Sequence, residues 1–242
     1  MAMLLLDRPF LEAQLGESAQ LDLRNISAAV WPTLLSMCRA SDLSLYHLTL
    51  SSLEGIERLV NTRQLTLEWA SKIDDLGPVF RLHQLTSLSI FDFPKLRHLD
   101  GIASLVELTE LHLSGSRGAT NPPLRLASIA PVTQLPNLVT LSLANAKLDD
   151  DDITVLARCS CLRHLHLSRQ FERAQVAFLA KRLNGKLAEP LAAYFDTNLK
   201  CEACHGPRFM FVGRRMPVLC RSCDSVQFAR SVAEFERLVH DA

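Results

Sequence analysis

Residues 85–90 read LTSLSI, and the aliphatic pattern of this stretch, L-x-x-L-x-L, recurs along most of the chain. Four further complete copies begin at Leu45, Leu108, Leu138 and Leu162. Two more copies, residues 18–23 and 62–67, lack only the first leucine. Because aliphatic and polar residues alternate in each L-x-L segment, each copy predicts a short strand that buries every second side chain.

The seven copies together define a repeat of uneven length. Their last aliphatic residues, separated by 17 to 30 residues, are Leu23, Leu50, Leu67, Ile90, Leu113, Leu143 and Leu167. Repeats of this length are typical of solenoids in which each coil adds one strand. A single coil cannot bury its aliphatic face alone, so the seven coils must share one core.

This repeat resembles that of leucine-rich-repeat proteins. Residues 129–138 are similar to the short repeats of the internalin type, and residues 149–167, with a helix expected over 152–158, resemble the longer ribonuclease-inhibitor type. The resemblance covers about two thirds of the chain. It implies an α/β fold, a leucine-rich repeat solenoid with parallel strands on the concave face, and by family habit a role in binding proteins.

One position departs from the family pattern. Leucine-rich repeats usually carry Asn three residues after the last strand leucine, where it bonds the turn backbone. With the frame above, none of the seven positions holds Asn. We therefore expect irregular turns, and we expect the Gly/Pro-rich loop over residues 114–123 to protrude.

The flanking segments divide the chain into four parts. Residues 1–17 are expected to form an N-terminal cap, and residues 18–170 the solenoid, with a convex helix over 32–39. Residues 171–199 are expected to form a helical C-terminal cap, with helices over 171–183 and 189–195. The remaining residues, 200–242, are expected to form a separate metal-binding module.

Two C-x-x-C pairs predict that metal site. Fifteen residues separate the pair Cys201 and Cys204 from the pair Cys220 and Cys223, and two such pairs complete a tetrahedral shell around one structural Zn²⁺ ion. Four cysteine ligands leave no open position for water or substrate. The alternatives are a redox-active pair, or His205 in place of one thiolate.

The segment around the cysteines predicts a hairpin over residues 208–219 and a helix over 225–240. Two knuckles, a hairpin and a terminal helix resemble a treble-clef finger, whereas a terminal strand would indicate a zinc ribbon. About 40 residues cannot fold on apolar burial alone, so metal binding is expected to supply much of the folding energy.

Composition favours a cytoplasmic protein without a membrane anchor. The chain of 242 residues has 26 basic and 26 acidic residues, so no overall charge attracts nucleic acid or lipid. Seven cysteines, an odd number, argue against a secreted disulfide framework. The first residues, MAMLLLDR, are too short and too early interrupted by charge for a signal peptide.

Two groups of residues are candidates for the binding of a protein partner. Exposed aromatic residues flanked by acids are typical of interface hot spots, and this group comprises Glu68, Trp69, Phe91 and Asp92. The alternative is that Trp69 and Phe91 belong to the core. The second group consists of polar strand positions: Glu110, His112, His164 and His166. His112 is expected two strands from the other histidines, too far to share a metal ion.

These observations favour a non-enzymatic protein-interaction module with a zinc finger as a second contact or cap. An alternative is a nucleic-acid-associated factor that uses the basic residues of the finger, Arg208, Arg214, Arg215 and Arg221. Phe209 and Phe211 would then stack on bases, although packing under the terminal helix is favoured. Further alternatives are an inhibitor or immunity-type protein for a toxin or effector, by resemblance alone, and an enzyme with an unrecognised site.

Overall fold

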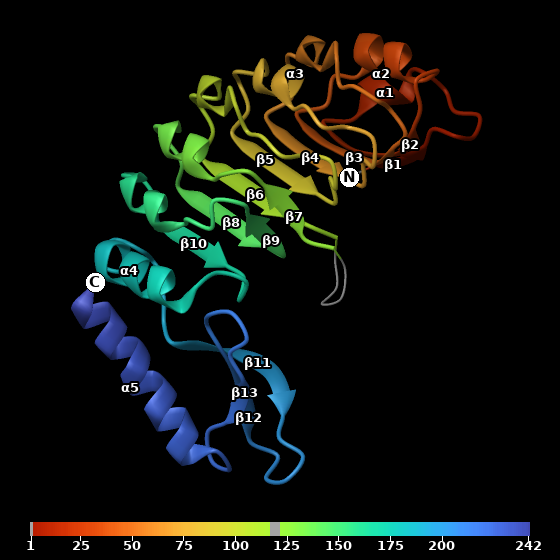
Figure 1. The fold of residues 1–242 in the computed structure, drawn as a ribbon. Coiled ribbons are helices and arrows are strands. Elements are labelled where there is room, and N and C mark those ends of the chain that lie inside the picture. The colour runs from red at the N-terminus through yellow and green to blue at the C-terminus, as the bar shows by residue number, and fades with distance from the viewer. Residues whose placement is uncertain (1, 117–121) are drawn as a thin grey trace.

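The computed structural model describes residues 2–116 and 122–242. Within these residues, eight parallel strands form one curved sheet whose strand order follows the sequence (Figure 1). The strands are β1 (Ala2–Leu5), β2 (Gln20–Ile26), β3 (Asp42–Leu48), β4 (Gln64–Glu68), β5 (Ser87–Phe91), β6 (Glu110–Ser114), β8 (Thr140–Ala144) and β10 (His164–Leu167). The predicted α/β solenoid is therefore confirmed, and β1 adds a strand from the segment expected as the N-terminal cap.

Short helices follow the outer side of the arc, opposite the strands (Figure 1). They are α1 (Gln14–Glu17), α2 (Trp31–Met37), η1 (Ile56–Arg58), α3 (Gly77–Phe80), η2 (Ile102–Ser104), η3 (Ala130–Gln134) and η4 (Thr154–Arg158). Proline lies in the first turn of α2, α3 and η3, where its missing N–H costs no hydrogen bond. The helix expected over 32–39 is confirmed as α2, whereas the one expected over 152–158 is the shorter 3₁₀ turn η4.

The predicted frame of the second repeat is wrong by five residues. In β3, Leu43 and Leu45 pair with the ladder leucines of β2 and β4, so the ladder residue is Leu45 and Leu50 lies beyond the strand. Residues 43–50 read LSLYHLTL and contain two overlapping L-x-L segments, which alternation alone cannot distinguish. With Leu45 in the frame, the first three ladder leucines are spaced evenly, 22 residues apart.

The turns that follow five of the strands are regular, contrary to the expectation from the missing asparagines. Two residues after the last ladder residue of five coils, the backbone adopts positive φ: Asn25 (63°), His47 (59°), Trp69 (62°), Asp92 (56°) and Asn145 (45°). The next residue is buried and apolar in each of these coils: Ile26, Leu48, Ala70, Phe93 and Ala146. Backbone hydrogen bonds then join neighbouring turns, as from Trp69 N–H to Phe91 O (3.0 Å), and these bonds replace the side-chain ladder of asparagines.

The inward-facing ladder residues form one continuous core. Leu23, Leu45, Leu67, Ile90 and Leu113 are all at most 1% exposed. Burial of each such side chain contributes about 1.5–3 kcal/mol before the entropy of ordering is subtracted. Because each strand of the large sheet pairs only with the strands of the adjacent coils, each coil stabilises its neighbours along the solenoid.

A second, smaller sheet joins the longest repeat to the one that follows it. Strands β7 (Leu124–Leu126) and β9 (Ala146–Leu148) pair in parallel, with Arg125 opposite Lys147. Strand β7 lies in the additional length between Leu113 and Leu143, and β9 follows Leu143. Residues 117–121 of the loop that was expected to protrude lie outside the described part of the chain.

After the last coil, the expected helix over 171–183 is present as α4 (Arg173–Leu183), but the one expected over 189–195 is wrong. Tyr194 instead begins a strand that pairs with Phe211, because pairing with a neighbouring strand outweighs a weak local helix signal. Strands β11 (Tyr194–Lys200), β12 (Pro207–Phe211) and β13 (Val218–Cys220) form an antiparallel sheet, followed by α5 (Ser225–Asp241). The predicted hairpin and terminal helix are thus confirmed.

The C-terminal module packs against the end of the solenoid through α4 and α5 (Figure 1). The guanidinium of Arg173 in α4 is buried at this contact, where it donates to the Ser231 carbonyl and lies 3.6 Å from Glu234. Phe209 and Phe211 pack on Phe228 of α5, with ring centroids 5.6 and 5.1 Å apart, and Tyr194 joins the same cluster. The two phenylalanines therefore lie under the terminal helix, as favoured from the sequence, and not on an exposed stacking surface.

Candidate metal centre and interaction surface

The four predicted metal ligands converge at one end of the antiparallel sheet. All four cysteine Sγ atoms lie within 4.8 Å of one another, with 3.8 Å between Cys201 and Cys223 and 3.4 Å between Cys204 and Cys220. A tetrahedral zinc ion with Zn–S bonds of about 2.3 Å requires sulfur atoms about 3.8 Å apart. The four thiols therefore fit a single tetrahedral ion.

Backbone hydrogen bonds fix the two loops that carry these cysteines. The Cys201 N–H donates to the Gly206 carbonyl and the His205 N–H to the Cys201 carbonyl, both at 2.9 Å, which closes the loop between β11 and β12. In the loop between β13 and α5, the Cys220 N–H donates to the Asp224 carboxylate at 2.8 Å. His205, with φ of 57°, completes the first turn and is not part of the ligand cluster.

The thiols also shift one another's pKa values. The backbone N–H of Cys223 points at Cys220 and lowers the pKa of that thiol to about 7. A hydrogen bond with Cys204 raises the pKa of Cys223 to about 12, since two neighbouring thiolates repel each other. All four groups can be thiolates together only when a cation neutralises them, so metal binding and deprotonation are coupled.

The predicted hot-spot residues lie together on the inner face of β3–β5. Tyr46, Trp69 and Phe91 line a groove of about 310 Å³ with Glu68 and Asp92. Trp69 is 43% exposed and Phe91 is half-buried, so neither belongs to the core. The buried aromatic residue nearby is Phe93, in the turn after β5. Tyr46 was missed as a site residue because of the misplaced frame, and the 22-residue spacing was the signal that would have placed it on the inner face.

Trp69 occupies an unusual position in this groove. It is the one bulky aromatic residue in the column of positive φ angles, where Asn, Asp and Gly are far more usual. Its ring stacks on His47, with centroids 4.1 Å apart and planes at 22°, and meets the edge of Tyr46 at 5.7 Å. His47 is held in turn by Asn25, at 2.8 Å from Nδ1 to Oδ1. A strained backbone thus supports an exposed and well-oriented aromatic side chain.

Acidic residues share the inner face with the groove. Outward positions of the first six strands and the turn after β5 carry five carboxylates: Asp22, Asp42, Glu68, Asp92 and Glu110. Among the described strand residues of this face, Arg24 is the basic counterpart; it is paired with Asp22 at 2.8 Å and lies 4.9 Å above the Tyr46 ring. The inner face of the N-terminal half is therefore acidic and aromatic.

The polar positions of the C-terminal half form no such cluster. Ser142 lies between His112 and His166 in the sheet register, so two strand spacings separate these imidazoles, as expected. His164 lies at the start of the same strand as His166. In the described part of the chain, no group of three or more ligands other than the four cysteines is placed to hold a metal ion.

The four arginines considered for nucleic-acid binding do not share one surface. Arg208 donates to the Val218 carbonyl at 3.4 Å within the hairpin, and Arg221 lies 5.9 Å above the Phe228 ring. Arg214 and Arg215 belong to the turn between β12 and β13, which faces the solenoid. No helix in the described part of the chain has both the length and the apolar character needed to cross a bilayer.

Comparison with known proteins identifies the fold. The sequence matches no protein-family profile and no curated protein. Among solved structures, an internalin from Listeria monocytogenes (InlF) is similar over 72% of this chain and 48% of its own, with a TM-score of 0.52 and 16% identity. The fold is a leucine-rich-repeat solenoid. A leucine-rich-repeat protein of Leptospira interrogans aligns over 65% of this chain and 38% of its own, with a TM-score of 0.46 and 22% identity.

The chain thus spans about half the length of the internalin structure and less of the Leptospira protein. The leucine-rich-repeat fold provides an open inner face on which side chains at every second strand position are available to a partner. The solenoid carries a four-cysteine module at its C-terminal end that is suited to a metal ion.

Proposed function

We propose that this chain is a non-enzymatic protein-interaction module that binds a protein partner on the inner face of the solenoid, at the groove of Tyr46, Trp69 and Phe91. The observation that carries the proposal is the conformation of Trp69. A bulky side chain in the left-handed region costs on the order of 1–2 kcal/mol. Since Trp69 is 43% exposed, core packing does not account for that cost, whereas a role as a binding anchor does.

The charge of the groove indicates the chemistry of the partner. Carboxylates of Glu68 and Asp92 border the aromatic rings, and the neighbouring strands add further acids. Complementary charge steers association and disfavours partners of the wrong sign. We infer a partner surface that offers basic side chains around an apolar residue, with Lys or Arg stems lying on the rings.

For the C-terminal module we propose a structural role with zinc as the metal. Cys201, Cys204, Cys220 and Cys223 would hold one Zn²⁺ ion, which would supply folding energy to a small module. The hairpin followed by α5 favours a treble-clef finger over a zinc ribbon. Zinc-bound thiolates suit a reducing compartment, so we place the protein in the cytoplasm.

The test is a quantitative affinity enrichment with the zinc-loaded full chain, followed by measurement of the dissociation constant for each enriched protein. Trp69→Ala and Phe91→Ala are each expected to weaken the partner by about 1–3 kcal/mol, or roughly 5- to 150-fold. Phe195→Ala is the matched control, because Phe195 is 47% exposed and lies in β11, away from the groove. Partners that bind all three variants equally would refute the assignment of the groove.

A further inference from the structure

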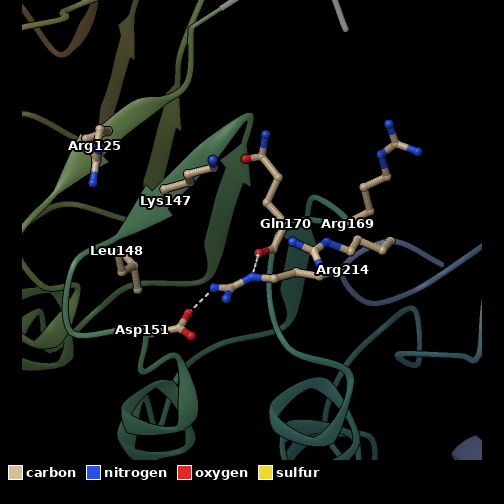
Figure 2. A pocket seen from close by; sticks show the side chains of 8 residues that line it. Arg125, Lys147, Leu148, Asp151, Arg169, Gln170 and Arg214 are labelled. Carbon is tan, nitrogen blue, oxygen red and sulfur yellow. Dashed lines mark hydrogen bonds and ion pairs between the residues drawn. The ribbon is translucent and has the colours of Figure 1, made fainter. Parts of the chain in front are cut away.

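A basic cleft lies where the C-terminal module meets the solenoid (Figure 2). It has a volume of about 620 Å³, and five cationic side chains line it: Arg125, Lys147, Arg169, Arg214 and Arg215. Three of these belong to the solenoid and two to the turn between β12 and β13. Neither segment forms the cleft alone, which is why the sequence pattern did not reveal it.

The repeat itself builds the solenoid wall of this cleft. Arg125 in β7 and Lys147 in β9 are register partners, and Arg169 follows Lys147 at the same interval of 22 residues. Parallel strands lie about 4.8 Å apart, so β7 and β9 place Arg125 and Lys147 side by side, and Arg169 comes from the turn after β10. In Figure 2, Arg125, Lys147 and Arg169 follow one another from left to right, and the arrangement is an open track more than a closed pocket.

Acidic residues neutralise part of this charge. Asp149 pairs with Arg125 at 3.2 Å and also with Arg97, outside the cleft. Arg214 is held by Asp151, by Glu172 at 3.1 Å and by the Gln170 carbonyl at 2.6 Å. The carboxylates of the nearby Asp150 and Asp152 accept the backbone N–H groups of Asp152 and Thr154, at the start of η4. These contacts of Arg214 therefore hold the turn between β12 and β13 against the solenoid.

Three cations remain available to a ligand. In the described part of the chain, Lys147 and Arg215 make no ion pair, and the side-chain contact of Arg169 is with the Met210 sulfur at 3.5 Å. All three side chains belong to exposed residues. Arg215 has a φ of 58° and Gly213, two residues earlier, a φ of 111°, and the Arg215 side chain lines the cleft.

The lining also limits what the ligand is. No aromatic ring is among the described residues that line the cleft, and Leu148 is the one aliphatic residue. Stacking on bases and apolar anchoring are therefore weak, while a line of cations suits regularly spaced phosphates. We propose that this cleft binds the phosphate backbone of nucleic acid without reading the bases. The inference is independent of the aromatic groove and of any protein partner bound there.

The test is fluorescence anisotropy with the zinc-loaded full chain, a labelled 20-base-pair duplex and a labelled single strand of the same length, over a series of salt concentrations. Lys147→Gln and Arg215→Gln are each expected to weaken duplex binding by about 3- to 10-fold and to make the slope of log K against log salt shallower by about 1. Because stacking contributes little, the duplex should bind at least as tightly as the single strand. Lys72→Gln, an exposed lysine far from the cleft in sequence, is the matched control.

Three outcomes would overturn the proposal. They are no duplex binding at low salt, equal weakening by the Lys72 control, and competition by polyglutamate as strong as that by duplex at equal charge, which would indicate an acidic protein as the ligand. Trp69→Ala should leave duplex binding unchanged. The proposal for the cleft and the proposal for the aromatic groove can therefore be refuted separately.

Discussion

Replacement of Trp69 by Asn tests whether the Trp69 side chain is a binding anchor or a structural part of the fold. Asn tolerates the left-handed backbone, so the change relieves about 1–2 kcal/mol of strain. Against this stands the loss of the His47 stack and of the buried part of a ring that is 43% exposed. A little over half of a tryptophan side chain corresponds to roughly 100 Å², or about 2.5 kcal/mol.

The two effects nearly cancel, and we expect Trp69→Asn to destabilise the fold by about 1 kcal/mol. In a chain of this size that corresponds to a decrease in Tm of about 2–4 °C. Phe93→Ala, one turn along and 1% exposed, is the core reference and should cost about 3–5 kcal/mol.

The assay is thermal and urea unfolding of wild type and both variants, followed by circular dichroism. A loss of about 3 kcal/mol or more for Trp69→Asn would show that the ring supports the core, and the proposed anchor would then have to be abandoned. A loss near 1 kcal/mol, combined with at least roughly fivefold weaker partner binding, is the expected result.

Three further predictions concern the C-terminal half. Cys204→Ser should reduce bound zinc from about one ion per chain to near zero, by metal analysis, and should unfold α5 while most of the solenoid signal remains. Burial raises the pKa of Cys159 to about 11, so between pH 9 and pH 11 the folded chain retains a proton that the unfolded chain has lost; stability should fall over that range, and Cys159→Ala should flatten the fall by on the order of 1 kcal/mol per pH unit. Gly213→Ala should destabilise the contact between the C-terminal module and the solenoid by about 1–3 kcal/mol, because φ is 111° and a Cβ would lie 2.8 Å from the Arg173 Cβ. The measurement is hydrogen exchange in α4, which should become faster. Gly185→Ala is the control, since no atom lies within 4 Å of its Cβ.

The sequence predicts the solenoid well because its physical cause is local and repeated. The alternation in each L-x-L segment indicates which of its side chains are buried, and seven copies make the prediction insensitive to an error in any one of them. The failure at residues 43–50 has the same origin, since overlapping L-x-L segments are equivalent until the spacing of neighbouring coils selects Leu45. The turns failed for another reason: backbone conformation, and not the identity of one characteristic side chain, makes them regular.

The two sites differ in how far the sequence reveals them. Four cysteines in two close pairs specify a metal centre directly, because each pair is a local motif with a fixed geometry. The exposure of Trp69 could not be predicted, since the choice between core and surface depends on which residue of the turn after β4, Trp69 or Ala70, points inward. The cleft could not be predicted from the sequence, because Lys147 and Arg215 come to line the same cleft only after the chain has passed through α4 and folded back.

The order of the strands follows the order of the sequence, and this has a consequence for the spacing of the two surfaces. The aromatic groove lies on β3–β5, and the basic cleft begins at β7 and β9. The distance between the groove and the cleft therefore depends on the number of coils between them. Insertion of one coil would move the cleft by one strand spacing, about 4.8 Å, and leave the residues of both surfaces unchanged. A ligand that bridges the two surfaces would therefore select for coil number, independently of selection on either site.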